Sequence, residues 1–185
     1  MKRSCVGKLI FLGILSIGMC SASPIFWPGS GHWYEITSGP MSWTNAQSEA
    51  TSKGGYLVAV SDSAEQAFLV STFAPSGGWE NFLWIGLWDP QGNGNFVWVN
   101  GEQVVYTNWA AGEPNNANQP TPGVEWAVEL RTGSFNGEWN DRDGSFDQIY
   151  GLIEYDTYIP EPATLLFVGS GLIGLSLIRR RLVRS

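Results

Sequence analysis

Phe82-Leu83-Trp84-Ile85-Gly86-Leu87 is a continuous run of apolar residues and glycine near the middle of the chain. A short run of this kind, rich in aromatic and branched side chains, predicts a buried strand. Other segments with strand character lie on both sides of it. They are residues 32–36, 56–60, 96–99, 103–106, 124–130, 137–139 and 150–155. The sequence therefore predicts that this run is one strand of a larger sheet.

Two helices are predicted before the buried strand. Ser42 can cap a helix over residues 43–53, and Asp62 with Glu65 three positions later forms a capping-box pattern that opens a helix ending near residue 73. Helices early in the chain and strands later indicate an α+β domain. We expect two helices, small antiparallel sheets and a long loop.

The long loop covers residues 108–123 and is rich in glycine, proline and asparagine. A loop of this length in a compact domain is usually either functional or disordered. Trp109 near its start and Trp126 just after it would tether it to a core. We therefore expect an ordered binding loop, with disorder as the alternative.

The central part of the chain is strongly acidic. The whole chain has a formal charge of −7, but residues 23–159 contain three basic and sixteen acidic residues, a difference of −13. A field of this sign repels nucleic acids and attracts cations. Nucleic acid is therefore excluded as an expected partner.

Two tripeptides place oxygen-bearing side chains where a cation could bind. They are Glu113-Pro114-Asn115 and Trp139-Asn140-Asp141, and Glu125 lies between them. Calcium prefers several carboxylate and amide oxygens. A cis bond before Pro114 would point Glu113 and Asn115 toward one ion, and the Asp141 backbone carbonyl would add a ligand. The same groups could bind the hydroxyl groups of a sugar.

With these motifs the chain resembles the C-type lectin-like domain family over about residues 31–156. The resemblance rests on Trp84-Ile85-Gly86-Leu87, on Tyr106-x-Asn108-Trp109, and on the two tripeptides in order. It implies a primary calcium and carbohydrate site whose ligands are Glu113, Asn115, Glu125, Asn140 and Asp141. The Glu-Pro-Asn variant implies mannose, glucose, N-acetylglucosamine or fucose-type recognition, whereas Gln-Pro-Asp is associated with galactose.

The chain departs from the family pattern in two ways. Small or apolar residues stand where the family places two disulfides: Ala50, Ala127, Gly144 and Ile153. A second, auxiliary calcium site is not expected, because only one acid matches it. Asp89 is that acid, while Asn93, Asn116 and Trp126 stand where acids are often found.

The N-terminus predicts a secretory signal peptide over residues 1–22. Basic residues precede an apolar run over residues 9–19, and small residues follow near Ala22. A retained helical anchor is the alternative, although the run is short for a membrane span. Cys20 also suggests a lipoprotein, but Met19 stands where a small residue is needed. Cys5 and Cys20 are the only cysteines, so the domain over residues 24–159 has no disulfide.

The C-terminal residues 160–185 predict a second targeting signal. Pro160-Glu161-Pro162 precedes an apolar stretch over residues 163–178 and then three arginines, which are typical of the cytoplasmic end of a membrane helix. This arrangement resembles the PEP-CTERM sorting signal of Gram-negative bacteria. It implies transient anchoring in the inner membrane, processing by an exosortase, and delivery to the cell surface or extracellular polysaccharide matrix. A plain C-terminal anchor is the alternative.

Three functions are compatible with these features. The first is calcium-dependent binding of a glycan or polysaccharide at the cell surface, and the second is a structural or adhesive role in which calcium only braces the loop. The third, a glycosidase using Glu113 and Glu125, is disfavoured because both are better explained as metal ligands. His32 is expected to pack on the first strand. Trp79, Trp88 and Trp126 are the expected surface tryptophans, whereas Trp33, Trp43, Trp84, Trp109 and Trp139 are expected in the core.

Overall fold

The computed structural model describes residues 23–73, 82–117, 125–146 and 149–158. The predicted signal peptide and sorting signal lie outside these ranges, as does the last part of the long loop. No helix in the described ranges is long and apolar enough to cross a membrane. The described residues thus belong to the domain between the two predicted targeting segments.

Both predicted helices are present. In α1 (Trp43–Ser52) the Ser42 hydroxyl accepts a hydrogen bond from the Asn45 N–H, and the helix buries Trp43, Ala46 and Ala50 on one face. In α2 (Ser63–Phe73) the Asp62 carboxylate accepts from the N–H groups of Ala64 and Glu65, at 2.8 Å each.

The capping box at α2 is displaced by one residue from the predicted arrangement. The Glu65 carboxylate accepts from the backbone N–H and the hydroxyl of Ser61, both at 2.7 Å. It therefore closes the turn before Asp62. Its second oxygen accepts from the Tyr34 hydroxyl at 2.6 Å, so this buried glutamate also joins α2 to the sheet.

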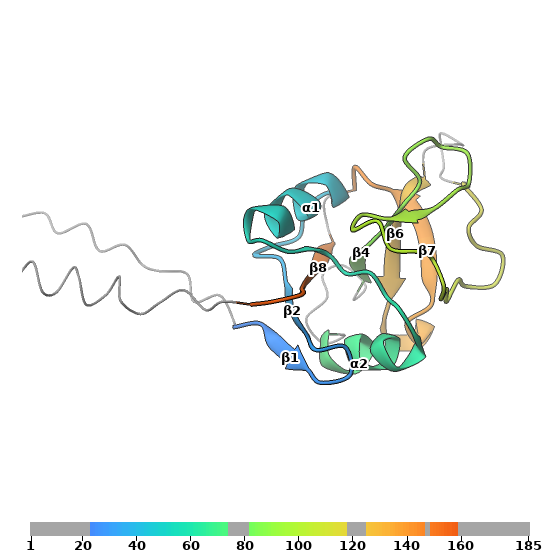
Figure 1. Ribbon diagram of the computed structural model, residues 1–185. Coiled ribbons are helices and arrows are strands. Elements are labelled where there is room, and N and C mark those ends of the chain that lie inside the picture. The colour runs from blue at the N-terminus through green and yellow to red at the C-terminus, as the bar shows by residue number, and fades with distance from the viewer. Residues whose placement is uncertain (1–22, 74–81, 118–124, 147–148, 159–185) are drawn as a thin grey trace, which may run out of the picture.

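The strands form one mixed sheet (Figure 1). Their bounds are β1 (Ile25–Trp27), β2 (His32–Ile36), β3 (Tyr56–Leu57), β4 (Phe82–Trp88), β5 (Val97–Trp98), β6 (Glu125–Arg131), β7 (Trp139–Asp143) and β8 (Tyr150–Tyr155). The order is β1-β2-β8-β4-β6-β7, with β3 paired to β8 and β5 paired to β4. All strand pairs are antiparallel except β4 with β8, so the sheet is mixed rather than purely antiparallel.

Two strand predictions are wrong in place or existence, the strand predicted over residues 56–60 is limited to Tyr56–Leu57, and one observed strand is not predicted. Residues 103–106 form no strand: the first three side chains are exposed, Val105 to 75%, and only Tyr106 packs against the core. The strand predicted over residues 137–139 runs instead over β7, so Asn140 and Asp141 lie within it rather than at its end. The short strand β1 has no counterpart among the sequence predictions.

The buried run that predicts the fold is β4, and β6 and β8 flank it (Figure 1). Gly86 lets this strand approach its neighbour, because a Cβ atom there would lie 2.2 Å from the Leu57 carbonyl oxygen. The fully buried indole of Trp84 donates to the Met41 carbonyl at 2.9 Å. The indole of Trp139 donates to the Gln66 side chain at 2.9 Å. Both of these buried indole N–H groups thus have an acceptor.

Packing occupies the positions at which the family resemblance implies disulfides. Ala50 and Ile153 are both fully buried in one small cluster with Tyr155. Ala127 is fully buried in a second cluster, and the Trp126 ring covers Gly144 so closely that a Cβ atom there would lie 2.3 Å from it. These contacts supply apolar burial where a bridge would otherwise constrain the chain.

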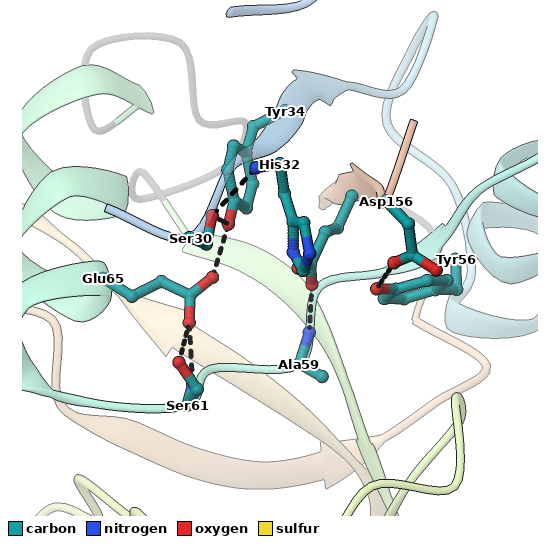
Figure 2. Close-up of polar contacts among 9 residues, drawn as sticks. Ser30, His32, Tyr34, Tyr56, Ala59, Ser61, Glu65 and Asp156 are labelled. Carbon is teal, nitrogen blue, oxygen red and sulfur yellow. Dashed lines mark hydrogen bonds and ion pairs between the residues drawn. The ribbon is translucent and has the colours of Figure 1, made fainter. Parts of the chain in front are cut away.

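A buried polar network joins β2, β8 and α2 (Figure 2). The Glu154 carboxylate lies 2.6 Å from His32 Nδ1 and accepts from the Ala59 N–H at 2.9 Å. His32 therefore has a carboxylate partner, which corrects the expectation that it is only a packing residue. The cause is the register of β2 and β8, in which Glu154 pairs with Tyr34 and so lies diagonal to His32, two residues away on the same face of β2.

Candidate functional site

The first part of the long loop is bound to β7. The Trp139 N–H donates to the Asn108 carbonyl at 2.7 Å, and the Ala110 N–H donates to the Trp139 carbonyl at 2.9 Å. These two bonds hold residues 108–110 along the strand that contains Asn140 and Asp141. The loop is therefore ordered in its described part, and the Glu113–Pro114 peptide bond is cis.

Asp141 connects the two tripeptides. Its side chain is almost fully buried and accepts hydrogen bonds from the Asn115 N–H at 3.0 Å and the Asn116 N–H at 2.8 Å. The loop residue Asn115 and the strand residue Asp141 are therefore in direct contact.

Glu125 joins the same group from the start of β6. The Ala117 N–H donates both to Asn115 Oδ1 at 2.7 Å and to Glu125 Oε2 at 2.8 Å. The Glu125 N–H donates in turn to Asn116 Oδ1 at 3.1 Å. An amide oxygen and a carboxylate oxygen thus converge on one N–H group.

Glu113 has one carboxylate oxygen whose hydrogen-bonding capacity is unused. Its Oε2 atom is buried and has no hydrogen-bond partner among the described residues. Burial raises the pKa of Glu113, and the negative charge of Asp141 raises it further. Burial also raises the pKa of Glu125, with additional repulsion from Asp141 and Glu113. Carboxylates that destabilise one another's charged forms provide a favourable place for a cation.

Asn140 donates to a neighbour that sequence reasoning missed. Its Nδ2 donates to Glu129 Oε1 at 3.1 Å and to the Asp141 backbone carbonyl at 2.6 Å. The sequence predicts that carbonyl as an ion ligand, and in the structure it accepts from Asn140. The Asn140 Oδ1 is the acceptor that this amide can still offer.

Glu129 and Arg142 support Asn140 from β6 and β7. Glu129 is almost fully buried, accepts from Arg142 Nη1 at 2.9 Å, and lies opposite Asn140 in the strand register. Burial raises the pKa of Glu129 to about 7, although Arg142 opposes the shift. Neither residue could be found from the sequence, because their pairing depends on the register of β6 and β7.

The donor set fits a hard cation only when amide oxygens are included. In the described part of the chain, no three histidine, cysteine, aspartate or glutamate side chains form a metal-binding group by themselves. The site residues instead combine the carboxylates of Glu113, Glu125 and Asp141 with the amides of Asn115 and Asn140. Mixed carboxylate and amide oxygens suit calcium, and the buried orphan oxygen of Glu113 is the clearest sign that a partner belongs there.

Asp89, the acid that matches the auxiliary site, has a local role. It accepts from the Gln91 N–H at 3.1 Å and the Gly94 N–H at 2.6 Å. These bonds close the turn after β4, so both of its oxygens are engaged by the backbone.

The burial of the tryptophans differs in part from the sequence prediction. Trp43, Trp84 and Trp139 are buried as predicted, whereas Trp33 and Trp109 are only partly buried. Trp88 and Trp126, expected on the surface, pack on Trp43 with ring centroids 5.4 Å from it in each case. They therefore belong to an aromatic cluster and are not exposed rings on which a sugar could stack. Trp79 lies outside the described residues.

Two protein-family models match the chain. The family model described as the lectin C-type domain matches residues 39–149. The chain belongs to the C-type lectin family. A second model, the PEP-CTERM protein-sorting motif, matches residues 159–181. C-type lectin is a non-enzymatic kind of domain, and the match supports carbohydrate binding in general terms.

Among curated proteins, the perlucin-like protein of Mytilus galloprovincialis is 31% identical over 78% of this chain and 97% of its own length. Lectin BRA-3 of Megabalanus rosa is 32% identical over 61% of this chain and 65% of its own length. Among solved structures, the cow CD23 C-type carbohydrate-recognition domain, determined in the presence of a GlcNAc2Man3 oligosaccharide, has a TM-score of 0.62 at 26% identity. It covers 76% of this chain and 98% of its own.

The fold also occurs without calcium. A calcium-independent type II antifreeze protein has a TM-score of 0.60 at 20% identity, covering 74% of this chain and 93% of its own. Fold similarity alone therefore does not decide whether a chain binds calcium, because that depends on the residues at its site.

Proposed function

We propose that this protein binds carbohydrate in a calcium-dependent manner, with recognition of mannose, glucose or fucose-type hydroxyl pairs. The observation that supports this best is the junction of Asn115, Glu125 and Asp141, together with the unpartnered Oε2 of Glu113. The ligands would be Glu113, Asn115, Glu125, Asn140 and Asp141. When bound, the ion would accept lone pairs from two adjacent sugar hydroxyls.

The protein's own groups would complete sugar recognition. The carboxylates of Glu113 and Glu125 can accept the hydroxyl protons, and the amide nitrogen of Asn115 can donate to a hydroxyl oxygen. Since Glu129 already holds the Asn140 nitrogen, Asn140 would contribute its oxygen. Hydrogen bonds to the charged carboxylates are stronger than those between neutral groups.

The sorting motif supports a place outside the cell. We propose export through the predicted signal peptide, transient anchoring in the inner membrane by residues 163–178, and processing by an exosortase. The mature domain would then reach the cell surface or the extracellular polysaccharide matrix. Polysaccharide at that location is the proposed class of ligand.

A structural or adhesive role is the second candidate. Protein N–H groups already occupy both oxygens of Asp141, and Ala117 bridges Asn115 and Glu125. These bonds brace the loop with no ion required. In that case calcium would add rigidity and the partner would be a protein.

A glycan array probed with and without a calcium chelator separates the two candidates. We expect binding to mannose-type glycans that the chelator abolishes and that added calcium restores. Glu125→Gln should lose this binding, whereas the control Glu102→Gln should keep it, because Glu102 is exposed and is not a proposed ligand. A melting temperature that falls in chelator, with no glycan bound in calcium, would favour the structural role instead.

A further inference from the structure

A strip of aromatic side chains lies on the surface where the described chain begins and ends. The ring centroids of Phe26 and Trp33 are 5.1 Å apart, and those of Trp33 and Tyr158 are 5.5 Å apart. Tyr155 lies beneath, 5.7 Å from Tyr158, and anchors the rings to a buried cluster. We call Phe26, Trp33 and Tyr158 the aromatic strip.

The strip is open to solvent at its edge. In the described part of the sheet β1 is a terminal strand, and its Phe26 and Ile25 side chains are 45% and 43% exposed. Trp33 and Tyr158 are half-buried. Exposed and contiguous apolar rings are typical of a contact surface.

The strip lies where the chain enters and leaves the domain. Phe26 pairs with Trp33 across β1 and β2, and Trp33 pairs with Tyr155 across β2 and β8. Figure 1 shows the start of β1 beside the end of β8. Tyr158 is the last described residue before the C-terminal segment, and the apolar stretch begins five positions later at Ala163. Five extended residues span at most about 18 Å.

We propose that the aromatic strip rests on the surface of the lipid bilayer while residues 163–178 hold the protein in the membrane. This inference depends on the membrane anchoring included in the proposed function. The rings of Trp33 and Tyr158, each with one polar end, favour the level of the lipid headgroups, and the short connection keeps the strip within reach of that level.

The contact depends on ring burial rather than on attraction to anionic lipid. Lys53, which follows the helix packed against β8, is paired with Glu35 and Glu49 at 2.9 Å each. The acidic Asp156 accepts a hydrogen bond from the Tyr56 hydroxyl. A neutral phosphatidylcholine surface is therefore sufficient, and added salt should change the contact little.

This arrangement would orient the ligand site. The strip involves β1 and β2, whereas the calcium and carbohydrate site belongs to β6 and β7 at the other end of the strand order. Figure 1 shows these strands on opposite sides of the domain. A domain seated on its aromatic strip would thus present the site away from the membrane.

Tryptophan fluorescence of the full chain tests the proposal. The chain is reconstituted in phosphatidylcholine vesicles whose lipids carry bromine close to the headgroup, which quenches only nearby indoles. We expect partial quenching in the wild type, loss of most of it in Trp33→Phe, and no loss in the control Trp126→Phe. Phe26→Ser should weaken quenching, whereas the exposed control Val105→Ser should not.

The possible outcomes have different consequences. If Trp33→Phe leaves quenching unchanged while the chain still floats with vesicles, the strip does not contact the bilayer. Absence of quenching together with concentration-dependent cross-linking that Phe26→Ser abolishes would assign the strip to a second copy of the chain and overturn the proposal. If the chain does not float with vesicles at all, both the membrane anchoring and this inference fail. Calcium-dependent glycan binding is measured separately and would stand.

Discussion

At the residue scale, the site depends on a few buried or partly buried charged groups. Glu113 has an orphan oxygen, Glu129 is an almost fully buried carboxylate, and Arg142 supplies the charge that offsets Glu129. Each group is tolerated in its position because another group, or the proposed ion, compensates its charge. Changes to single residues here should therefore have effects that depend on charge as well as on shape.

The first prediction concerns sugar preference. Changing Glu113→Gln together with Asn115→Asp exchanges the positions of the acid and the amide around the proposed ion. Since these groups accept and donate to the sugar hydroxyls, preference should move from mannose toward galactose, with weaker mannose binding. Competition by the two monosaccharides against an immobilised glycan measures the change. An unaltered order of competition in a folded double variant would remove these residues from the site.

The second prediction concerns Arg142. Arg142→Met would leave Glu129 buried without its cation, and breaking a buried pair costs about 3–5 kcal/mol. Because the pKa of Glu129 is then raised further, the loss should be largest above pH 7 and smaller at pH 5, where Glu129 is protonated. Urea unfolding at both pH values gives the free energies. The double variant Glu129→Gln with Arg142→Met should recover stability at high pH, and equal losses at both pH values would contradict this charge pairing.

At the element scale, backbone pairing and caps position the site. The loop is held on β7 by residues 108–110, and β6 carries both Glu125 and Glu129 toward it. Sequence patterns predict β4, β8 and both helices well, because apolar runs and caps leave clear local signals. They place β7 wrongly, because its polar residues do not resemble a buried strand. They also fail for residues 103–106, whose β-branched composition suggests pairing that the tertiary structure does not provide.

Gly86 gives a prediction for β4. Gly86→Ala would place a methyl group 2.2 Å from the Leu57 carbonyl oxygen, so β3 and β4 would have to separate. Overpacking of this kind usually costs about 1–3 kcal/mol. Gly39→Ala is the matched control, since a Cβ atom there meets nothing within 4 Å. Thermal unfolding should show a lower melting temperature for Gly86→Ala only, and equal melting of the two variants would contradict the packing argument.

Glu154 gives a prediction for the junction of β2 and β8. Burial raises the pKa of Glu154 from 4.5 to about 7, although the Ala59 N–H and His32 oppose the shift. The folded state therefore retains a proton that the unfolded chain loses, so this group's contribution to stability is full below pH 4.5 and declines as pH rises toward 7. Glu154→Gln removes this titration while keeping an acceptor for Ala59.

The measurement is the free energy of unfolding at pH 5 and pH 8 for the wild type and for Glu154→Gln. We expect the wild type to lose more stability between the two pH values than the variant does, by roughly 1.4 kcal/mol for each unit of the pKa shift that lies above pH 5. If both proteins have the same pH dependence, Glu154 does not carry the shifted proton.

At the scale of the whole molecule, charge and packing explain a domain that folds with no disulfide in its sequence. The acidic centre of the chain attracts cations, and buried tryptophans with satisfied N–H groups fill the core. The five proposed ligands follow from the two tripeptides, from Glu125 between them, and from the resemblance to a family. Glu129 and Arg142 cannot, because a cross-strand partner is visible only once the strand register is known.

Calorimetric titration of the full chain with methyl α-mannoside, in calcium and then in chelator, is the decisive test of a sugar site built on calcium. We expect saturable binding in calcium, none in chelator, and loss of binding in Glu125→Gln with the fold retained. Binding that is unchanged by chelator, or absent in calcium for a folded protein that does bind the ion, would contradict such a site.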